Sequence, residues 1–204
     1  MHVTVNIPEM IDVVFDLAGE TPPVSYPFAL WSEIVRLSPP LGKHENIGIL
    51  PLRLPANHDA TLHKRVKLII RLPAALSEQA LSDLSGHDIA VDGRKLSIGP
   101  GKKRNLQSHP TLHAHMVAGN PDEVSFMADM SEQMQKLGVT GNLICGKRHT
   151  LTNGQQSVQG FSLVIHDLKP DASLRLQFAG LGGSRQFGCG IFIPFKVITG
   201  IHDN

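Results

Sequence analysis

Short runs of alternating apolar and polar residues along the first half of the chain are separated by apolar residues at helical spacing. Alternation and β-branched residues predict strands, whereas apolar residues that recur every three or four positions predict helices. On this basis we expect strands over 10–17, 47–54 and 66–72, and helices over 28–37 and from Ser77 to Leu84. A further strand, a turn at Asp92-Gly93 and another strand are expected over 88–98.

The second half of the chain repeats this order of elements. Here we expect strands over 111–118, 142–151, 157–167 and 190–195, and helices over 122–137 and 171–179. The two middle strands form a hairpin with its turn near Asn153-Gly154. Each half therefore follows the order β-α-β-β-α-β. This order predicts an α+β protein with tandem ferredoxin-like halves, a topology shared with the RNA-recognition module.

The boundary between the halves is predicted at a cluster of turn residues followed by three cations. Gly99-Pro100-Gly101 precedes Lys102, Lys103 and Arg104, the densest basic cluster of the chain. We therefore expect an N-terminal domain over 1–100, a basic linker over 101–110 and a C-terminal domain over 111–204. The cations fit a solvated linker and a phosphate-binding segment equally well.

Composition narrows the class of protein. Of the 204 residues 41% are hydrophobic, but no apolar run reaches the length of a membrane span. The first residues lack an export signal, and two cysteines supply neither a disulfide scaffold nor a cysteine zinc site, so we expect a cytoplasmic protein. A net charge of +1 and an aromatic content of 5% argue against bulk attraction to polyanions and against a broad base-stacking platform. Nucleic-acid binding must then come from local basic patches.

A glycine-rich stretch near the end of the chain carries the clearest motif. Gly180, Gly182, Gly188 and Gly190 form two Gly-x-Gly pairs around five residues that include Arg185, and a short apolar strand follows. Glycine allows positive φ and close backbone approach, so such a loop around a cation suits an anion. The alternative is a tight turn that serves internal packing. A Walker-type loop lacks its Gly-Lys-Ser/Thr here, and a dinucleotide loop would lead into a helix.

With this motif at the end of a duplicated ferredoxin-like pattern, the chain resembles the Cas6-type CRISPR repeat endoribonucleases. Their wider superfamily carries Gly-h-Gly-x5-Gly-h-Gly, where h is apolar and one of the five is Lys or Arg, and this chain fits every position. Segments 161–168 and 173–176 are also similar to the C-terminal half of that family. The resemblance implies cleavage of CRISPR precursor RNA by attack of a 2′-hydroxyl, which leaves a 2′,3′-cyclic phosphate and a 5′-hydroxyl. It implies no metal and no other cofactor.

This reaction needs groups that remove and deliver protons, and histidine titrates in the useful range. Family members commonly carry that histidine in or just after the first helix, and His44 fits this place. We expect His44 to act as general acid or base, Lys43 to stabilise the phosphorane, and Tyr26 to orient the phosphate or the nucleophile. His58 and His63 are the alternatives if His44 is only a solvated loop residue.

Basic and glycine residues are expected to hold a folded RNA hairpin by its backbone. These candidates are Lys102, Lys103, Arg104, Lys147, Arg148, Gly180, Gly182, Arg185, Gly188 and Gly190. Two further polar residues, His113 and His115, lie two apart on a predicted strand and so share one face. They fit polar strand positions, RNA contacts or two metal ligands, but no third ligand at a matching spacing accompanies them, and we expect no metal site.

Two functions remain open at this point, besides a ferredoxin-like module unrelated to RNA. The first is an endoribonuclease that makes and retains the processed CRISPR RNA. The second is a catalytically silent RNA-binding subunit of a CRISPR effector complex. The expected partners are CRISPR repeat RNA, in the form of a stem-loop, and other Cas proteins of a type I effector complex, with no direct contact to DNA and no membrane. A histidine placed for catalysis separates the two functions.

Overall fold

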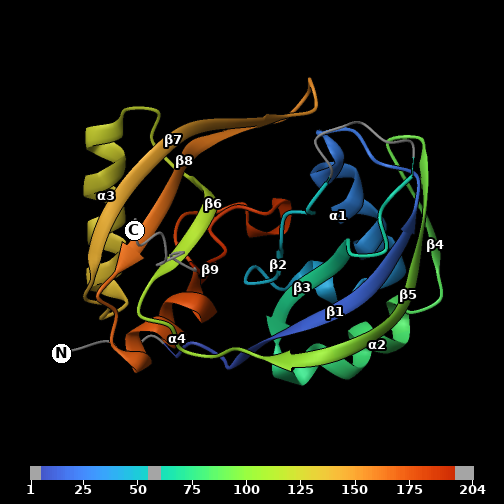
Figure 1. Cartoon of the computed structure of the whole chain (residues 1–204), viewed down its shortest axis with the longest axis horizontal. Helices are drawn as coiled ribbons and strands as arrows, with labels where there is room; N and C mark the ends of the chain where they lie inside the picture. The colour runs from blue at the N-terminus through green and yellow to red at the C-terminus, as the bar shows by residue number, and fades with distance from the viewer. Residues whose placement is uncertain (1–5, 55–60, 196–204) are drawn as a thin grey trace, which may run out of the picture.

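A computed structural model describes residues 6–54 and 61–195 of the chain. They form two α+β halves that lie side by side, each with an antiparallel sheet and helices (Figure 1). The first sheet has the order β2-β3-β1-β5-β4 and the second the order β7-β8-β6-β9. The second order is that of a ferredoxin-like sheet, and the first is the same with β4 added at one edge. The predicted tandem ferredoxin-like fold is confirmed.

The first half is built around its central strand β1. Its strands are β1 (Met10–Gly19), β2 (Gly48–Ile49), β3 (Lys67–Pro73), β4 (Asp88–Val91) and β5 (Arg94–Asn105). Its helices are α1 (Tyr26–Leu37) and α2 (Ser77–Leu84), with short 3-10 turns η1 (Leu41–Lys43) and η2 (Ala74–Leu76). The strand expected over 47–54 is reduced to β2, because the residues after Ile49 leave the sheet.

Alternation along β1 and β3 gives the first sheet two different faces. Val13 and Phe15 on β1, and Leu68 and Ile70 on β3, are buried in the hydrophobic core of this half. The residues between them point to the opposite face, because successive strand side chains alternate. That face carries charged side chains, among them Asp12 on β1 and Arg71 on β3, and it is the face that borders the second half.

The prediction of a basic linker over 101–110 is wrong for its first five residues, which form the end of β5. In β5, Lys102 pairs with Val14, and the register with β1 shifts between Phe15 and Leu17. The long strand β1 offers partners as far as residue 105, and the glycines before the triplet fit a bulge rather than a chain-reversing turn. The residues after 105 dock on α4 through Gln107 and His109. The division into domains over 1–100 and 111–204 stays a prediction.

The second half follows the expected order of elements closely. Its strands are β6 (Leu112–Ala118), β7 (Asn142–Thr152), β8 (Ser157–His166) and β9 (Ile193–Pro194). Its helices are α3 (Glu123–Lys136) and α4 (Pro170–Ala179), followed by the 3-10 turn η3 (Arg185–Phe187). The Asp122 carboxylate accepts the backbone N–H of Ser125 and so caps α3. The last strand is shorter than the expected 190–195, because its first residues belong to the glycine-rich loop.

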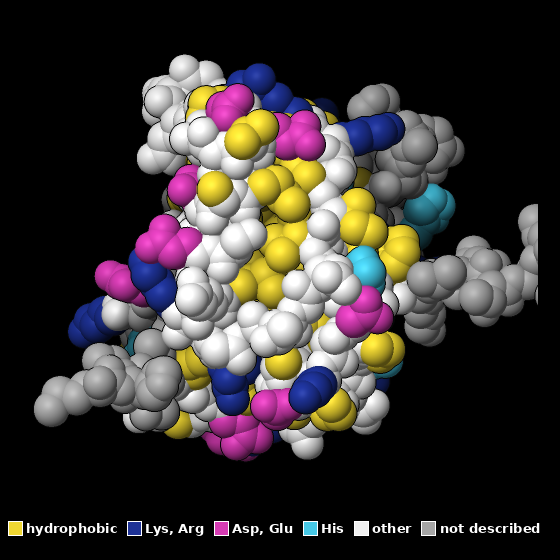
Figure 2. Space-filling model, turned by 90° about the vertical axis from the view of Figure 1, so that its left-hand side faces the viewer, with side chains coloured by type: hydrophobic (Ala, Val, Ile, Leu, Met, Phe, Trp, Pro, Cys, Tyr) yellow, Lys and Arg dark blue, Asp and Glu magenta, His cyan; other side chains and the backbone are white. Residues whose placement is uncertain are grey.

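The outer face of the second half, over α3 and β7, carries a band of hydrophobic side chains with acidic and basic groups around it (Figure 2). Val124 on α3 is 78% exposed, and Met127, Leu143 and Cys145 are partly buried against the core. The apolar band itself offers no positive charge to a polyanion. No helix in the described part of the chain is long and apolar enough to cross a membrane.

Candidate nucleic-acid interface

The glycine-rich loop folds back on itself where α4 ends. Gly180 and Gly190 both have a φ of 67°. A β-carbon at Gly180 would lie 2.4 Å from the carbonyl oxygen of Gly190, and one at Gly190 would lie 2.1 Å from that of Leu181. Both positions therefore require glycine for a backbone contact within the loop. Of the four motif glycines, Gly182 is exposed while Gly180, Gly188 and Gly190 are buried. Three of the glycines expected to contact RNA thus serve internal packing, and RNA contact by Gly182 stays a prediction.

Arg185 lies inside the protein rather than on the expected basic surface. It is 4% exposed, and its Nη1 donates to the carbonyl oxygens of Phe178 and Ala179 at 2.8 Å and 2.6 Å. These carbonyls belong to the last turn of α4, so the guanidinium caps that helix. Burial, together with the charge of Arg71 and against the opposing charge of Asp12, lowers the pKa of Arg185 to about 10. A buried cap of this kind does not reach RNA outside the molecule.

The glycine-rich loop also touches the first half of the molecule. The ring of Phe187 in η3 lies 4.6 Å from the ring of Phe28 on α1, centroid to centroid. Gly188 faces the carbonyl oxygen of Ile49 in β2 so closely that a β-carbon there would lie 3.3 Å from it. The loop therefore holds α1 and β2 of one half against α4 of the other, as Figure 1 shows for the red segment beside β2.

A buried ion pair of the first half is hydrogen-bonded to the second half. Arg71 on β3 is 1% exposed, and its Nε donates to Oδ1 of Asp12 at 2.8 Å. Its Nη1 donates across to the second half, to the carbonyl oxygen of Phe192 at 2.6 Å. Arg104 on β5 binds the other oxygen of Asp12 at 2.9 Å. Asp12 is thereby paired twice, and Arg71 connects the first sheet to the backbone of the second half.

A cleft of about 870 Å³ lies between the two sheets above this ion pair. Among the described residues that line it, five are Lys or Arg and one is acidic. The cations are Arg53, Arg65, Lys67, Arg71 and Arg104. Because Asp12 already binds Arg71 and Arg104, the cleft carries a positive field that attracts a polyanion. Phosphate groups of a nucleic acid match this field.

Strand geometry splits the predicted basic triplet between two faces. Arg104 pairs with Asp12 in the register of β1 and β5, and it lines the cleft. Lys102, two residues earlier, points to the same face of the sheet and is exposed. Lys103 points to the helix face, where its ammonium pairs with Glu78 on α2. The expectation that all three cations share one RNA-binding surface is therefore wrong for Lys103.

The opposite wall of the cleft is formed by histidines of the second sheet. His113 and His115 on β6 line the cleft, and the His115 ring lies 4.7 Å from that of His149 on β7. Burial lowers the pKa of His149, and the charges of His115 and Lys147 lower it further. Burial also lowers the pKa of His113, partly offset by its hydrogen bond to the Ile193 backbone. These two imidazoles therefore resist protonation.

A metal site at the histidine pair of β6, His113 and His115, would need further ligands beside them. Within residues 6–54 and 61–195, no group of three or more His, Cys, Asp and Glu is placed to hold a metal ion. The rings of His115 and His149 contact each other, and His113 packs edge-on against Phe195 at 5.3 Å between centroids. The arrangement suits ring contacts better than coordination.

Lys147 and Arg148 lie on β7 in the long hairpin with β8, which extends past the rest of the second sheet (Figure 1). Both side chains are exposed, and Nη2 of Arg148 donates to Oε1 of Gln159 on β8 at 3.1 Å. The register of β7 and β8 shifts between Cys145 and Arg148, so Lys147 lies outside the regular ladder while Arg148 pairs with Phe161. Contact of Lys147 and Arg148 with RNA stays a prediction. The buried Arg185 is not part of the surface that they form.

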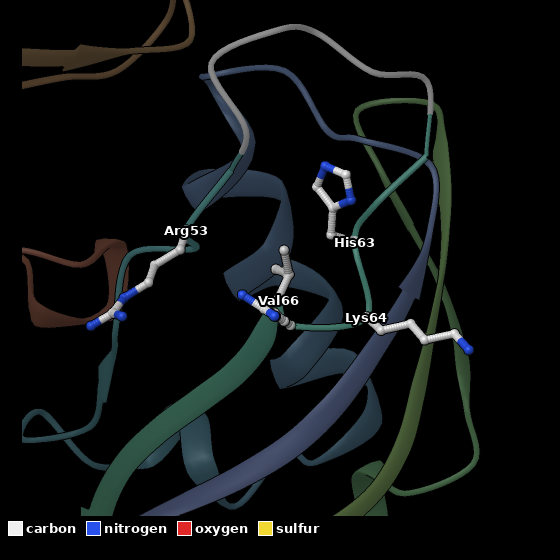
Figure 3. A pocket seen from close by; sticks show the side chains of 5 residues that line it. Arg53, His63, Lys64 and Val66 are labelled. Atoms are coloured by element: carbon white, nitrogen blue, oxygen red, sulfur yellow. The ribbon is translucent and has the colours of Figure 1, made fainter.

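A second cavity, of about 670 Å³, lies beside the first and contains His63. It is lined by Arg53, His63, Lys64, Arg65 and Val66 (Figure 3). In that view Lys64 and Arg53 point away from His63 in opposite directions, so their charges do not converge on its ring. His58, the other alternative for the catalytic histidine, lies outside the described residues.

The three catalytic candidates of the first half differ in exposure. Tyr26 is 8% exposed, its hydroxyl accepts the backbone N–H of Leu52 at 2.7 Å, and burial raises its pKa to about 12. The expectation that Tyr26 orients the phosphate is therefore wrong, because its hydroxyl is enclosed in the core. His44 and Lys43 are exposed on the connection between α1 and β2. Since β2 packs against η3, this connection enters the region where the two halves meet.

Several cleft residues escaped the sequence analysis. Lys67 and Arg71 alternate with buried residues along β3, so the alternation of that strand already placed both cations on the face away from the core. Arg53 and Arg65 flank the segment 55–60 and carried no periodic signal. His149 lies next to the lining residue His115, and their ring contact depends on the pairing of β6 and β7 with β8, which the sequence pattern does not show.

The tandem ferredoxin-like fold and its C-terminal glycine-rich loop define the structural class of this protein, and comparison with known proteins gives the family. A family model described as Cas6 Crispr matches residues 11–197. The CRISPR-associated endonuclease Cas6 of Myxococcus xanthus strain DK1622 is 31% identical over 192 residues, which cover 93% of this chain and 83% of that protein. The chain therefore belongs to the Cas6 family.

Two solved structures share the fold at low sequence identity. The product of a Cas6-related gene from Pyrococcus furiosus is 11% identical, with a TM-score of 0.68 over 90% of this chain and 98% of that one. Thermus thermophilus Cse3, bound to an RNA that represents a pre-cleavage complex, is 11% identical, with a TM-score of 0.54 over 91% and 98%. At these identities the likeness establishes the fold alone.

Proposed function

We propose that this chain is an endoribonuclease that cleaves the repeat of CRISPR precursor RNA. Membership of the Cas6 family over almost the whole chain carries the proposal, and the M. xanthus relative is itself named an endonuclease. The basic cleft between the sheets supports it, because Arg53, Arg65 and Arg104 are exposed along it and can bind the phosphates of an RNA strand. Other Cas proteins as partners remain a prediction.

The proposed chemistry is attack of a 2′-hydroxyl on the neighbouring phosphate. One group must take the proton of the 2′-hydroxyl, and another must give a proton to the departing 5′-oxygen. We assign one of these proton transfers to His44, with Lys43 next to it to offset the negative charge of the phosphorane. Both side chains are exposed and adjacent, so a bound phosphate can reach them. This mechanism requires no metal ion.

Cleavage in the presence of EDTA tests the proposal. The protein, incubated with its cognate repeat RNA and excess EDTA, should cut at one position. The products should carry a 2′,3′-cyclic phosphate and a 5′-hydroxyl, identified by mass spectrometry and by resistance of the 3′ end to poly(A) polymerase. Cleavage that stops in EDTA and returns with a divalent cation would contradict the mechanism. Tight binding with no cleavage under any condition would instead support the catalytically silent subunit.

The two faces of β5 predict different effects of charge reversal on RNA binding. Lys102→Glu and Arg104→Glu should each weaken binding and reduce the salt slope by about one, because each side chain lies on the cleft face. Lys103→Glu is the matched control, since Lys103 faces α2 on the other side of the same strand. Fluorescence anisotropy across a salt series measures both quantities. An equal loss at Lys103 would contradict the assignment of the binding face.

A further inference from the structure

The two walls of the cleft differ in chemistry as well as in position. The first half supplies all the Lys and Arg residues among the described residues that line the cleft. The second half supplies, from β6 and the segment around β9, the imidazoles of His113 and His115 and the apolar side chains of Ile191, Ile193 and Pro194. The first half also contributes the apolar side chains of Leu50, Pro51, Leu52 and Ile69, so the walls differ chiefly in where their cations lie. This asymmetry fits a ligand that is charged on one side and uncharged on the other.

The imidazole wall offers ring faces and ring edges to a ligand in the cleft. His115 is exposed, and its ring stands 4.7 Å from the partly exposed ring of His149 with the planes 48° apart. Burial and the positive charge of Lys147 disfavour protonation of His149. His113 lies near His115, and Arg53 from the first half lies near His113. The unprotonated ring of His149 carries one donor, one acceptor and a flat face, which match a nucleobase better than a phosphate.

We infer that the cleft holds a single-stranded segment of RNA with its phosphates on the cations of the first sheet and an unstacked base against His115 and His149. This inference rests on the proposed function and adds the orientation of the RNA and a base-binding site. Bases become accessible to side chains only where the RNA is not paired, so the segment in the cleft is not the stem of the expected stem-loop. Phe, Trp and Tyr make up only 5% of the chain, so the histidine pair supplies a stacking surface that these residues do not provide.

Variants of the two walls should change RNA binding in different ways. His115→Ala combined with His149→Ala should weaken binding of a single-stranded repeat segment by about tenfold, with the salt slope unchanged, because a stacked base carries no charge. Arg65→Ala combined with Lys67→Ala should lower both the affinity and the salt slope, because these residues face phosphates. His149→Phe keeps a ring and should retain most of the affinity, whereas loss of the fold would affect His149→Phe and the alanine variants alike.

Abasic RNA identifies the contact with the base directly. A series of segments, each lacking one base, is measured by anisotropy against the parent protein and the double histidine variant. At one or two positions, loss of the base should weaken binding to the parent about tenfold and leave binding to the variant unchanged. This pattern would show that the base and the two imidazoles contribute through the same contact. Independent losses at every position would overturn the inference.

The remaining outcomes separate failure of the inference from failure of the proposed function. If the histidine variant loses salt slope, the imidazoles contact phosphates and the inference is wrong. If Arg65 and Lys67 matter but the histidines do not, RNA lies in the cleft without the base site. If neither wall matters while the RNA is still cleaved, the proposed function stands and the cleft is not its binding site.

Discussion

Replacing His44 with alanine should abolish cleavage of the repeat RNA and leave its binding intact. General acid–base catalysis contributes about 10²- to 10⁴-fold to a rate, so the single-turnover rate constant should fall by that factor. His44 is exposed at the end of η1, next to Lys43, on a connection that leads into β2 beside the glycine-rich loop. An exposed side chain holds no core contacts, so the fold and the affinity for RNA should not change. Rapid-mixing cleavage assays and anisotropy measure the two effects separately.

Two variants serve as controls for His44. His87 is an exposed histidine just before β4, at the edge of the first sheet away from the cleft, so His87→Ala should cleave at the parent rate. Tyr26→Phe should also cleave at the parent rate, because the Tyr26 hydroxyl serves Leu52 inside the core. A cleavage rate of His44→Ala within a few-fold of the parent would contradict the assignment. His63, beside the second cavity, and His58 would then be the candidates.

Replacing Arg71 with methionine should lower the free energy of unfolding by about 3–5 kcal/mol, because removal of one partner leaves a buried charge unpaired. Asp12 is 1% exposed and would keep only Arg104, whose side chain is half exposed. The carbonyl oxygen of Phe192 would also lose its donor from across the cleft. The two halves would thereby lose this hydrogen bond between them. Equilibrium unfolding in urea measures the loss.

Lys67→Met is the matched control for Arg71→Met. Lys67 lies on the same strand and the same face, and its ammonium binds Oδ1 of Asp16 at 2.6 Å. That pair is exposed to solvent, so its loss should cost about 0–1 kcal/mol. Both variants exchange a cation for methionine, so the difference between their losses of unfolding free energy reports the effect of burial. Equal losses for the two variants would show that the buried pair between Arg71 and Asp12 does not stabilise the fold in the way described.

Strands and helices were predictable because alternation and helical spacing survive in each element. The strand over 66–72 and the helix from Ser77 appear almost where the pattern put them, as β3 and α2. The basic triplet after Gly101 was wrongly predicted to lie in a linker, because glycine and proline usually mark a turn. In the structure β1 is long enough to pair with residues beyond them. Pairing with a distant strand is a tertiary effect that no local pattern carries.

The site was less predictable than the fold. The glycine spacing around Arg185 located the loop, but the same spacing fits a loop that binds an anion and a loop that closes on itself. Only the approach of Gly180 to Gly190, and the helix end that Arg185 caps, distinguish the two. The predicted role of Tyr26 was wrong for a related reason. The first residue of a helix is exposed or buried depending on which segments pack against it. The cleft itself arises between two sheets, and its second wall comes from residues far away in the chain.

The central claim is that a 2′-hydroxyl of the repeat RNA attacks the neighbouring phosphate while the RNA is bound to this protein. It is tested most directly by a repeat RNA with a single 2′-deoxynucleotide just before the cleavage site, assayed in EDTA beside the unmodified RNA. The account predicts that the modified RNA binds with unchanged affinity and is not cut at that site. Cleavage of the deoxy-substituted RNA at the same position would contradict it, because the attacking group would then not be the 2′-hydroxyl.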